Sequence, residues 1–64
     1  MRITLKAARV NADLYQAEAA KRIGVDKKTL GSWENGKTFP PSDKIPIICS
    51  VYQREYDEID WVRH

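Results

Sequence analysis

Apolar and small residues recur along the chain at helical spacing, in short runs that glycine, proline, asparagine and aspartate interrupt. The first run covers residues 4–11, is rich in alanine and opens on Thr4, a residue type that caps helix N-termini. The second run covers residues 16–23 and stops at Gly24, which can take a positive φ and turn the chain sharply. We therefore expect two short helices here.

A third helix is expected directly after this turn. Asp26 is well suited to be its N-cap, and the run from Lys27 to Asn35 ends at a second glycine, Gly36. The pattern thus places two helices on either side of a tight turn.

Four apolar residues after the Pro40-Pro41 pair fall at positions i, i+3, i+4 and i+7, which predicts an amphipathic fourth helix. Proline is tolerated only in the first turn, so Pro46 places the N-cap near Asp43, with Ser42 as the alternative. A fifth short helical segment over residues 56–61 is expected to fold back onto this helix. The apolar residues are Ile45, Ile48, Cys49 and Tyr52 in the fourth helix, and Tyr56, Ile59 and Trp61 in the fifth.

The expected elements fit one all-α domain over residues 1–64, a compact bundle of five short helices. A chain of 64 residues buries only about 60% of the surface that its unfolded form exposes. One cysteine forms no internal disulfide, and one histidine, His64, forms no metal cluster, so helix packing alone must stabilise the fold. Cys49 lies in an apolar helical pattern and is interpreted as a small buried residue, which fits a reducing cytoplasm.

Charge is distributed unevenly along the chain, although the net charge is only +2. Residues 1–49 hold nine Lys/Arg and five Asp/Glu, whereas residues 50–64 hold two and four. The basic part favours a polyanionic partner, but the mixed surface of any soluble domain accounts for the same numbers. No apolar run reaches the roughly 18 residues of a membrane span, and no signal-peptide pattern is present, so we expect a soluble cytoplasmic protein without a membrane partner.

Residues 16–36 combine the constraints that a helix-turn-helix imposes. Two helices that cross at roughly 90–120° through a tight turn need a small residue such as Ala20 and a turn glycine such as Gly24. If Leu30 and Trp33 point into the core, the helical period turns a polar, basic face outward. This face consists of Lys27, Lys28, Gly31, Ser32 and Asn35.

The expected outer face suits the major groove of duplex DNA, which admits one α-helix whose N-terminal part reaches the base edges. Lys27 and Lys28 are the best candidates for these contacts. A lysine donates to guanine O6 and N7 or to a phosphate, so the two side chains either recognise bases or bind the backbone. We expect at least one of them to contact a base.

The stretch from Leu5 to Trp61 resembles the Cro/cI-type helix-turn-helix (XRE) family, and especially small regulators of phages and prophages of Gram-positive bacteria. The most similar segments are LKAARVNADLYQAEAAKRIGV and LGSWENGKTFP, followed by IICSVYQREYDEI. The resemblance implies a lambda-repressor-like domain whose third helix recognises double-stranded DNA. It also implies action in the cytoplasm of a bacterium or a phage-infected cell.

The same resemblance implies roles for individual residues. Gln16 is expected to hydrogen-bond a DNA phosphate at the positive end of the second helix. Arg9 and Glu34 are expected to form a partly buried, structural ion pair between the first helix and the end of the third. Asn35 and Gly36 are alternatively only a helix stop beside a solvated lysine. The base-contact candidates are Lys27, Lys28, Gly31 and Ser32, and the phosphate-contact candidates are Tyr15, Gln16, Asn35, Lys37 and Thr38.

The sequence departs from the family pattern near the start of the second helix. Asp13 stands where glycine is common, and aspartate can adopt a left-handed conformation, but its charge weakens a neighbouring phosphate contact. Tyr15 replaces the usual Ser or Thr cap, so we expect a poorly capped helix. Gly31 makes the recognition helix less stable than alanine would by roughly 1 kcal/mol, and it allows close approach to DNA.

The leading functional hypothesis is a sequence-specific transcription regulator, Cro-like or repressor-like, that binds a two-fold operator as a dimer with half-sites about 34 Å apart. The segment with Ile59 and Trp61 either forms the dimer surface or packs within the chain. The alternative is an antitoxin-like or scaffolding interaction module on the same fold. We expect no enzymatic activity, cofactor or small-molecule substrate, because no catalytic triad, metal-ligand spacing or phosphate-binding glycine loop is present.

Overall fold

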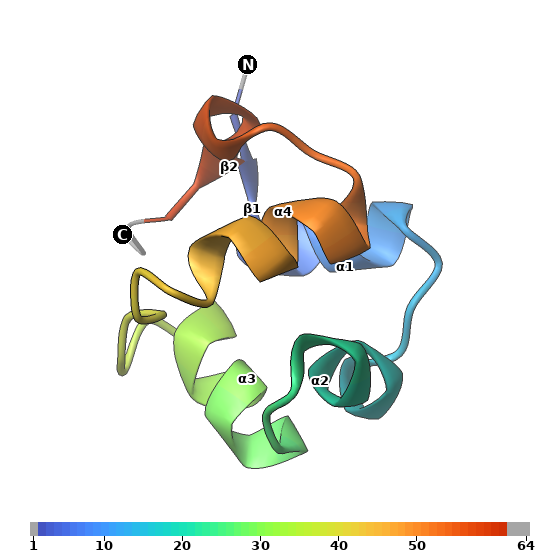
Figure 1. Ribbon diagram of the computed structural model, residues 1–64, viewed down its shortest axis with the longest axis vertical. Helices are drawn as coiled ribbons and strands as arrows, with labels where there is room; N and C mark the ends of the chain where they lie inside the picture. The colour runs from blue at the N-terminus through green and yellow to red at the C-terminus, as the bar shows by residue number, and fades with distance from the viewer. Residues whose placement is uncertain (1, 62–64) are drawn as a thin grey trace.

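The computed structural model describes residues 2–61 as four α-helices, one short 3-10 helix and two short strands (Figure 1). In this view α2 and α3 form the lower half of the molecule, α4 crosses above them in front of α1, and the strands lie at the top. The elements are β1 (Ile3–Thr4), α1 (Leu5–Asn11), α2 (Gln16–Ile23), α3 (Lys27–Glu34), α4 (Ile45–Tyr52), the 3-10 helix η1 (Tyr56–Glu58) and β2 (Ile59–Asp60).

Two of the expected helix caps are present. The Oγ1 atom of Thr4 accepts a hydrogen bond of 3.0 Å from the Ala7 N–H at the start of α1. At the start of α3, Asp26 Oδ1 accepts one of 2.9 Å from the Thr29 N–H. Hydrogen bonds from Thr29 lower the pKa of Asp26 below its ordinary value, so the capping carboxylate is charged at neutral pH.

The helix ends also follow the sequence-based expectation. Gly24 ends α2 with φ 97°, and Gly36 follows the C-cap residue Asn35 of α3 with φ 77°. Asp13, in the loop between α1 and α2, has φ 60°, the left-handed conformation proposed for it. Residues other than glycine, asparagine and aspartate rarely adopt a positive φ, so the residue types at these positions fit the turns that follow the helices.

The fourth helix begins one residue later than predicted. Its N-cap is Lys44, not Asp43 or Ser42, and no side chain caps it. The Lys44 N–H donates a hydrogen bond of 2.9 Å to the Pro41 carbonyl, so the chain first completes a turn and the helix starts only after it. Pro46 lies in the first turn, as expected, where its missing N–H costs little.

The prediction of five helices is wrong, because residues 2–61 form four α-helices and the fifth segment is a 3-10 turn followed by a strand. Strand β2 pairs in parallel with β1, with Ile3 opposite Ile59 and Thr4 opposite Asp60. A two-residue strand has no alternating pattern, and its partner lies at the other end of the sequence. No local signal could therefore have predicted this pair.

One apolar core joins the four α-helices and β2. Leu30 and Ile48 have no exposed surface, and Trp33 is 7% exposed, so the inward face expected for α3 is confirmed. Ala19 and Ala20 are also buried, which lets α2 approach its neighbours closely. The buried apolar residues are Leu5, Ala8, Leu14, Ala19, Ala20, Ile23, Leu30, Trp33, Ile48, Tyr52 and Ile59.

The C-terminal segment packs within the chain. Ile59 was expected either to form a dimer surface or to pack within the chain. It is 1% exposed, so it packs within the chain. Trp61 is half-buried, and its Nε1 donates a hydrogen bond of 2.8 Å to the Tyr56 carbonyl. Its ring stacks on that of Tyr56 with centroids 5.6 Å apart. Tyr56 itself is 58% exposed, and its 3-10 helix packs against α4, as expected.

Tyr52 packs its ring in the core, but its hydroxyl is buried without a hydrogen-bond partner among the residues that the structure describes. Burial raises the pKa of this phenol well above its ordinary value, and the nearby Glu34 carboxylate raises it further. The hydroxyl is therefore neutral at any ordinary pH. Burial of a donor that lacks a partner costs about 1–3 kcal/mol.

Tyr52→Phe is expected to leave the free energy of unfolding unchanged, or to raise it by about 1 kcal/mol, because phenylalanine keeps the ring and removes only the unpaired hydroxyl. Urea denaturation followed by circular dichroism measures the change. A loss of more than about 1 kcal/mol would mean that the hydroxyl has a hydrogen-bond partner in solution.

Candidate nucleic-acid interface

Helix α3 has one face in the core and the other in solvent. Leu30 and Trp33 are buried, whereas Lys27 and Lys28 are exposed. The other predicted base-contact residues, Gly31 and Ser32, are half-buried on the same helix. The outer face of α3 is therefore small, polar and basic, and the four residues lie together there.

The chain after α3 folds back on the end of this helix. The Lys37 N–H donates a hydrogen bond of 2.9 Å to the Ser32 carbonyl, and the Thr38 N–H donates one of 3.4 Å to the same oxygen. The side chains of Asn35, Lys37 and Thr38 are exposed in this turn. The structure thus places these three predicted phosphate contacts beside the C-terminal end of the basic face.

The start of α2 carries the other two predicted phosphate contacts. Tyr15 is its N-cap residue, makes no side-chain capping hydrogen bond and is 83% exposed, so the expected poor capping is confirmed. Gln16 is half-buried. The acidic residues Asp13 and Glu18 are exposed close by in the sequence, whereas the basic residues of α2, Lys21 and Arg22, lie in its last turn.

Arg9 and Glu34 form the ion pair that the family resemblance implies. Arg9 Nε lies 2.8 Å from Glu34 Oε2, and the two side chains are 10% and 3% exposed. A second hydrogen bond of 3.3 Å joins Arg9 Nη2 to Glu34 Oε1. Arg9 Nη1 also donates to the Leu14 carbonyl at 2.9 Å. Arg9 therefore connects α1 to Leu14, in the loop before α2, and to Glu34 at the end of α3.

The side chain of Gln16 is hydrogen-bonded to the carboxylate of this ion pair, a contact that was not predicted from the sequence. Gln16 Nε2 donates a hydrogen bond of 3.0 Å to Glu34 Oε1. The contact joins the first residue of α2 to the last residue of α3, and only the crossing angle of the two helices brings these residues together. No spacing in the sequence encodes that contact.

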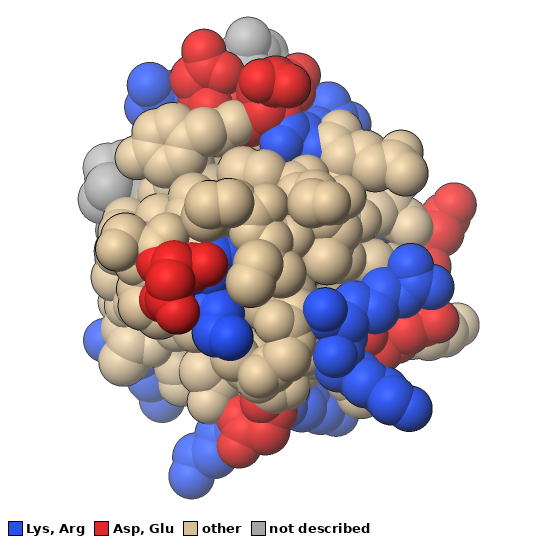
Figure 2. Space-filling view, in the orientation of Figure 1, with Lys and Arg blue, Asp and Glu red and all other residues tan. Residues whose placement is uncertain are grey.

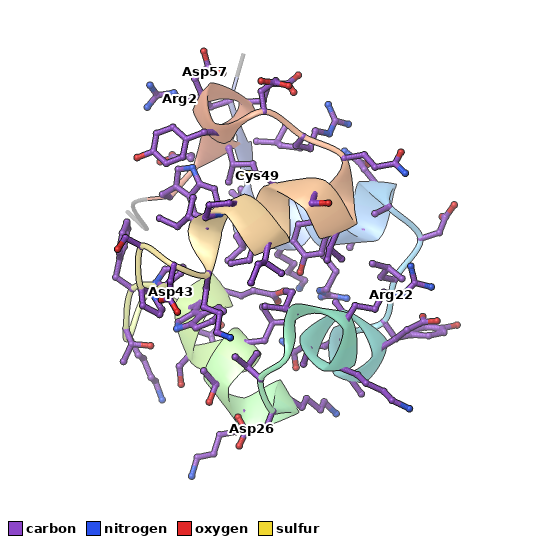
Figure 3. The ribbon with its side chains drawn as sticks, in the orientation of Figure 1. Arg2, Arg22, Asp26, Asp43, Cys49 and Asp57 are labelled. Atoms are coloured by element: carbon purple, nitrogen blue, oxygen red, sulfur yellow. The ribbon has the colours of Figure 1, made fainter. Side chains whose placement is uncertain are left out.

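Charges of both signs lie around the face seen in Figure 2. Acidic side chains cluster at the upper edge with basic ones on either side, and basic side chains project at the lower and right edges beside acidic ones. Figure 3 places Asp57 and Arg2 at this upper end and Asp26, the N-cap of α3, at the lower end. Helix α3 thus begins at the end of the molecule opposite the acidic cluster, where Lys27 and Lys28 are exposed beside Asp26.

Gly31→Ala is expected to raise the free energy of unfolding by about 1 kcal/mol, since alanine is the better helix former and Gly31 has no positive φ. A Cβ built at this position would lie 3.5 Å from Gln16 Nε2, which is ordinary van der Waals contact. Thermal unfolding measures the gain. A lower melting temperature would mean that the extra methyl group displaces Gln16.

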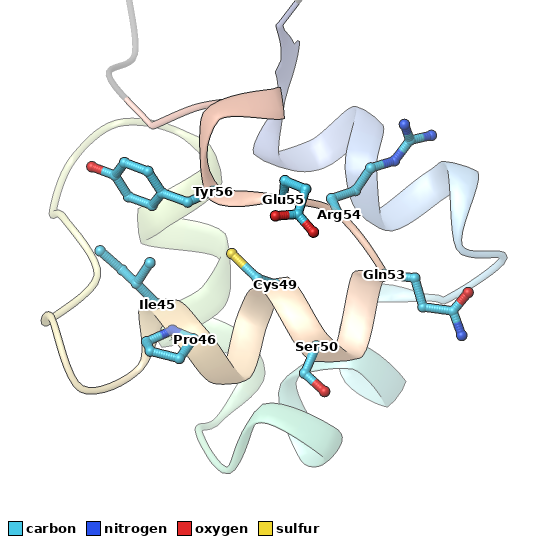
Figure 4. Close-up of a pocket in the computed structure, with 8 residues that line it drawn as sticks. All are labelled: Ile45, Pro46, Cys49, Ser50, Gln53, Arg54, Glu55 and Tyr56. Atoms are coloured by element: carbon cyan, nitrogen blue, oxygen red, sulfur yellow. The ribbon is translucent and has the colours of Figure 1, made fainter.

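An open groove lies on another surface, between α4 and the residues that follow it (Figure 4). Cys49 lines this groove and is half-buried, so it is less buried than expected: the helix turns the thiol toward the groove and not into the core. Burial raises the pKa of the thiol, and Glu55 raises it further, which favours the protonated form. The groove contains no residue of α2 or α3 and is separate from the basic face.

No helix within residues 2–61 is long and apolar enough to cross a membrane. The same stretch holds no group of three or more His, Cys, Asp and Glu side chains that could bind a metal ion. His64 lies outside the described residues, as do Met1, Val62 and Arg63 of the predicted 1–64 domain.

The helix-turn-helix family, of the XRE type, matches residues 5–59, from the first residue of α1 to the first residue of β2. The chain belongs to this family, which is of the DNA-binding type, and the resemblance inferred from the sequence is confirmed. No solved structure is significantly similar to the chain.

One relative is Antitoxin PezA of Streptococcus pneumoniae serotype 4 (strain ATCC BAA-334 / TIGR4). It is 33% identical to the chain over 55 residues, which are 86% of this chain and 35% of PezA. The chain thus spans about a third of the length of this relative.

Proposed function

We propose that the chain binds duplex DNA sequence-specifically, as a transcription regulator of the phage or prophage type. The observation that supports this most is the division of α3, which buries Leu30 and Trp33 and leaves Lys27 and Lys28 exposed on its first turn. A helix that enters the major groove needs such an outer face near its N-terminus. Membership of the helix-turn-helix family supports the same assignment.

In the proposed complex, α3 lies in the major groove and contacts bases through Lys27, Lys28, Gly31 and Ser32. Phosphates on either side of the groove are bound by the start of α2 and by the turn after α3. Two copies occupy a two-fold operator in the cytoplasm, where the DNA lies, and no catalysis is involved. One domain offers a small surface, so two half-sites are needed for tight specific binding. The phosphate contacts are Tyr15, Gln16, Asn35, Lys37 and Thr38.

Selection of bound sites from a random pool of duplex DNA tests the proposal. A sequence-specific dimer is expected to enrich one motif in two inverted copies whose centres lie about one helical turn apart. A protein that binds only the backbone would enrich no motif. Enrichment of a single, unrepeated motif would contradict the dimer.

Either Lys27→Ala or Lys28→Ala is expected to weaken binding to the selected site roughly tenfold, with a much smaller loss for random duplex, because a base contact acts on the matching sequence. Fluorescence anisotropy at constant salt measures both affinities. Arg2→Ala is the matched control, since it removes one positive charge at the opposite end of the molecule (Figure 3). Equal losses on both kinds of DNA for both variants would restrict these lysines to phosphate contacts.

An antitoxin-like interaction module is the second candidate, because the chain is 33% identical to an antitoxin over 55 residues. The salt dependence of binding to random duplex separates the two functions. Several phosphate contacts predict a steep fall of log K with log salt concentration. A flat response, or no binding, would favour the interaction module.

A further inference from the structure

The carboxylate of Glu34 is the centre of a hydrogen-bond network that joins three helices. It accepts two hydrogen bonds from Arg9, at 2.8 and 3.3 Å, and one from Gln16 Nε2, at 3.0 Å. The side chain of Glu34 is 3% exposed, so solvent competes little for these bonds. The carboxylate therefore does more than pair with Arg9, since it also orders a side chain at the first residue of α2.

The network fixes which end of the Gln16 amide faces the protein. A carboxylate only accepts hydrogen bonds, so the amide nitrogen and not the amide oxygen must point at Glu34. The nitrogen carries two hydrogens, and Glu34 takes one of them. The second N–H is available to another acceptor.

The Gln16 amide also lies beside Gly31 of α3. A Cβ built at Gly31 would lie 3.5 Å from Gln16 Nε2 and 3.7 Å from Gln16 Oε1, so both ends of the amide lie about equally close to this position. The amide therefore lies next to the outer face of α3, with room for a methyl group between the two.

We propose that Glu34 is a positioning residue for DNA binding: it holds the Gln16 amide so that the second N–H meets a DNA phosphate. This inference rests on the proposed function. A side chain that is ordered before DNA arrives loses less conformational freedom on binding than a free one, so the contact contributes more to affinity. The bond to Glu34 also couples the phosphate contact of α2 to the orientation of the recognition helix α3.

A purely structural role for Glu34 makes a different prediction. If Glu34 served only as the partner of Arg9, removal of the ion pair would weaken DNA binding by the same factor whether or not residue 16 is glutamine. A positioning role requires an acceptor for Gln16 even when the ion pair is absent. The two roles are separable because the acceptor can be kept while both charges are removed.

The test compares two variants that both lack the ion pair. Arg9→Met/Glu34→Gln keeps an amide oxygen that accepts from Gln16 Nε2, and Arg9→Met/Glu34→Leu keeps no acceptor. The first is expected to bind the selected duplex roughly 3- to 10-fold more tightly than the second, the range that one hydrogen bond supplies. When Gln16→Ala is added to both, the difference is expected to vanish. An equal difference with alanine at position 16 would overturn the positioning role.

Nuclear magnetic resonance of the unmodified chain provides a test that needs no variant to fold. The heteronuclear NOE of the Gln16 side-chain amide is expected to approach the values of the helix backbone in the free protein. The exposed side chain of Gln53 is the internal control and is expected to be mobile. A Gln16 value as low as that of Gln53 would overturn the inference.

Failure of the inference differs from failure of the proposed function. If the unmodified chain binds no DNA, both are overturned. If it binds DNA and Gln16→Ala binds equally well, the phosphate contact and the positioning role are overturned while the proposed function stands. If Gln16→Ala weakens binding but the two ion-pair variants bind alike, Glu34 has a structural role only.

Discussion

Replacing Glu34 with leucine is expected to lower the free energy of unfolding by about 3–5 kcal/mol, because it leaves the guanidinium of Arg9 buried without its partner. A domain of 64 residues has a total stability of about 3–10 kcal/mol, so this single change is expected to unfold much of the protein. Circular dichroism during thermal and urea denaturation measures the loss. A melting curve like that of the unmodified chain would mean that Arg9 finds solvent or another acceptor.

The double variant Arg9→Met/Glu34→Leu is the control for this result. It removes both charges and fills the site with apolar side chains of similar volume, which is often neutral for stability. We expect it to regain most of the lost stability, but not all, because the Leu14 carbonyl also loses the hydrogen bond from Arg9. If the double variant is no more stable than Glu34→Leu, the cost arises from packing around position 34 and not from the unpaired charge.

Gly24→Val is expected to lower the free energy of unfolding by about 2–3 kcal/mol, the cost of a β-branched residue at a positive φ. Gly24 has φ 97° and ψ 27°, and its N–H donates to the Ala20 carbonyl at 2.9 Å. The backbone angle and not a lack of space disfavours a side chain at position 24. An added Cβ would lie 3.8 Å from Lys44 Nζ, which is ordinary van der Waals contact. Urea denaturation measures the loss.

Gly24→Asn is the matched variant for this turn. Asparagine also carries a Cβ, but it adopts the left-handed conformation more readily than valine. We expect it to destabilise the domain clearly less than valine does. Equal losses for the two variants would show that any side chain at position 24 is excluded, for a reason other than the backbone angle.

Features of this fold that depend only on residues close together in the sequence could be predicted from it. The caps at Thr4 and Asp26 and the stop at Gly24 act within one helical turn, so residue type and position suffice. The exposed lysines of α3 follow from the helical period once Leu30 points inward. The start of α4 was misplaced because Ser42 and Asp43 belong to residue types that favour both turns and N-caps, and here they form the turn between Pro41 and Lys44.

Features that join distant parts of the chain could not be predicted in this way. The strand pair depends on contact between residues near opposite ends of the sequence. The Arg9–Glu34 pair was expected only from the family resemblance, because no periodicity relates these two residues. The bond between Gln16 and Glu34 was missed altogether, since it depends on how α2 and α3 cross.

The pairing of β1 with β2 has a consequence for the order of folding. Pairing of these strands closes a loop that contains nearly all residues between Ile3 and Asp60. The entropic cost of closing a loop grows with its length. Contacts between α2 and α3, which are neighbours in sequence, close a far smaller loop. The pairing of β1 with β2 is thus expected to follow the contact between α2 and α3 when the domain folds.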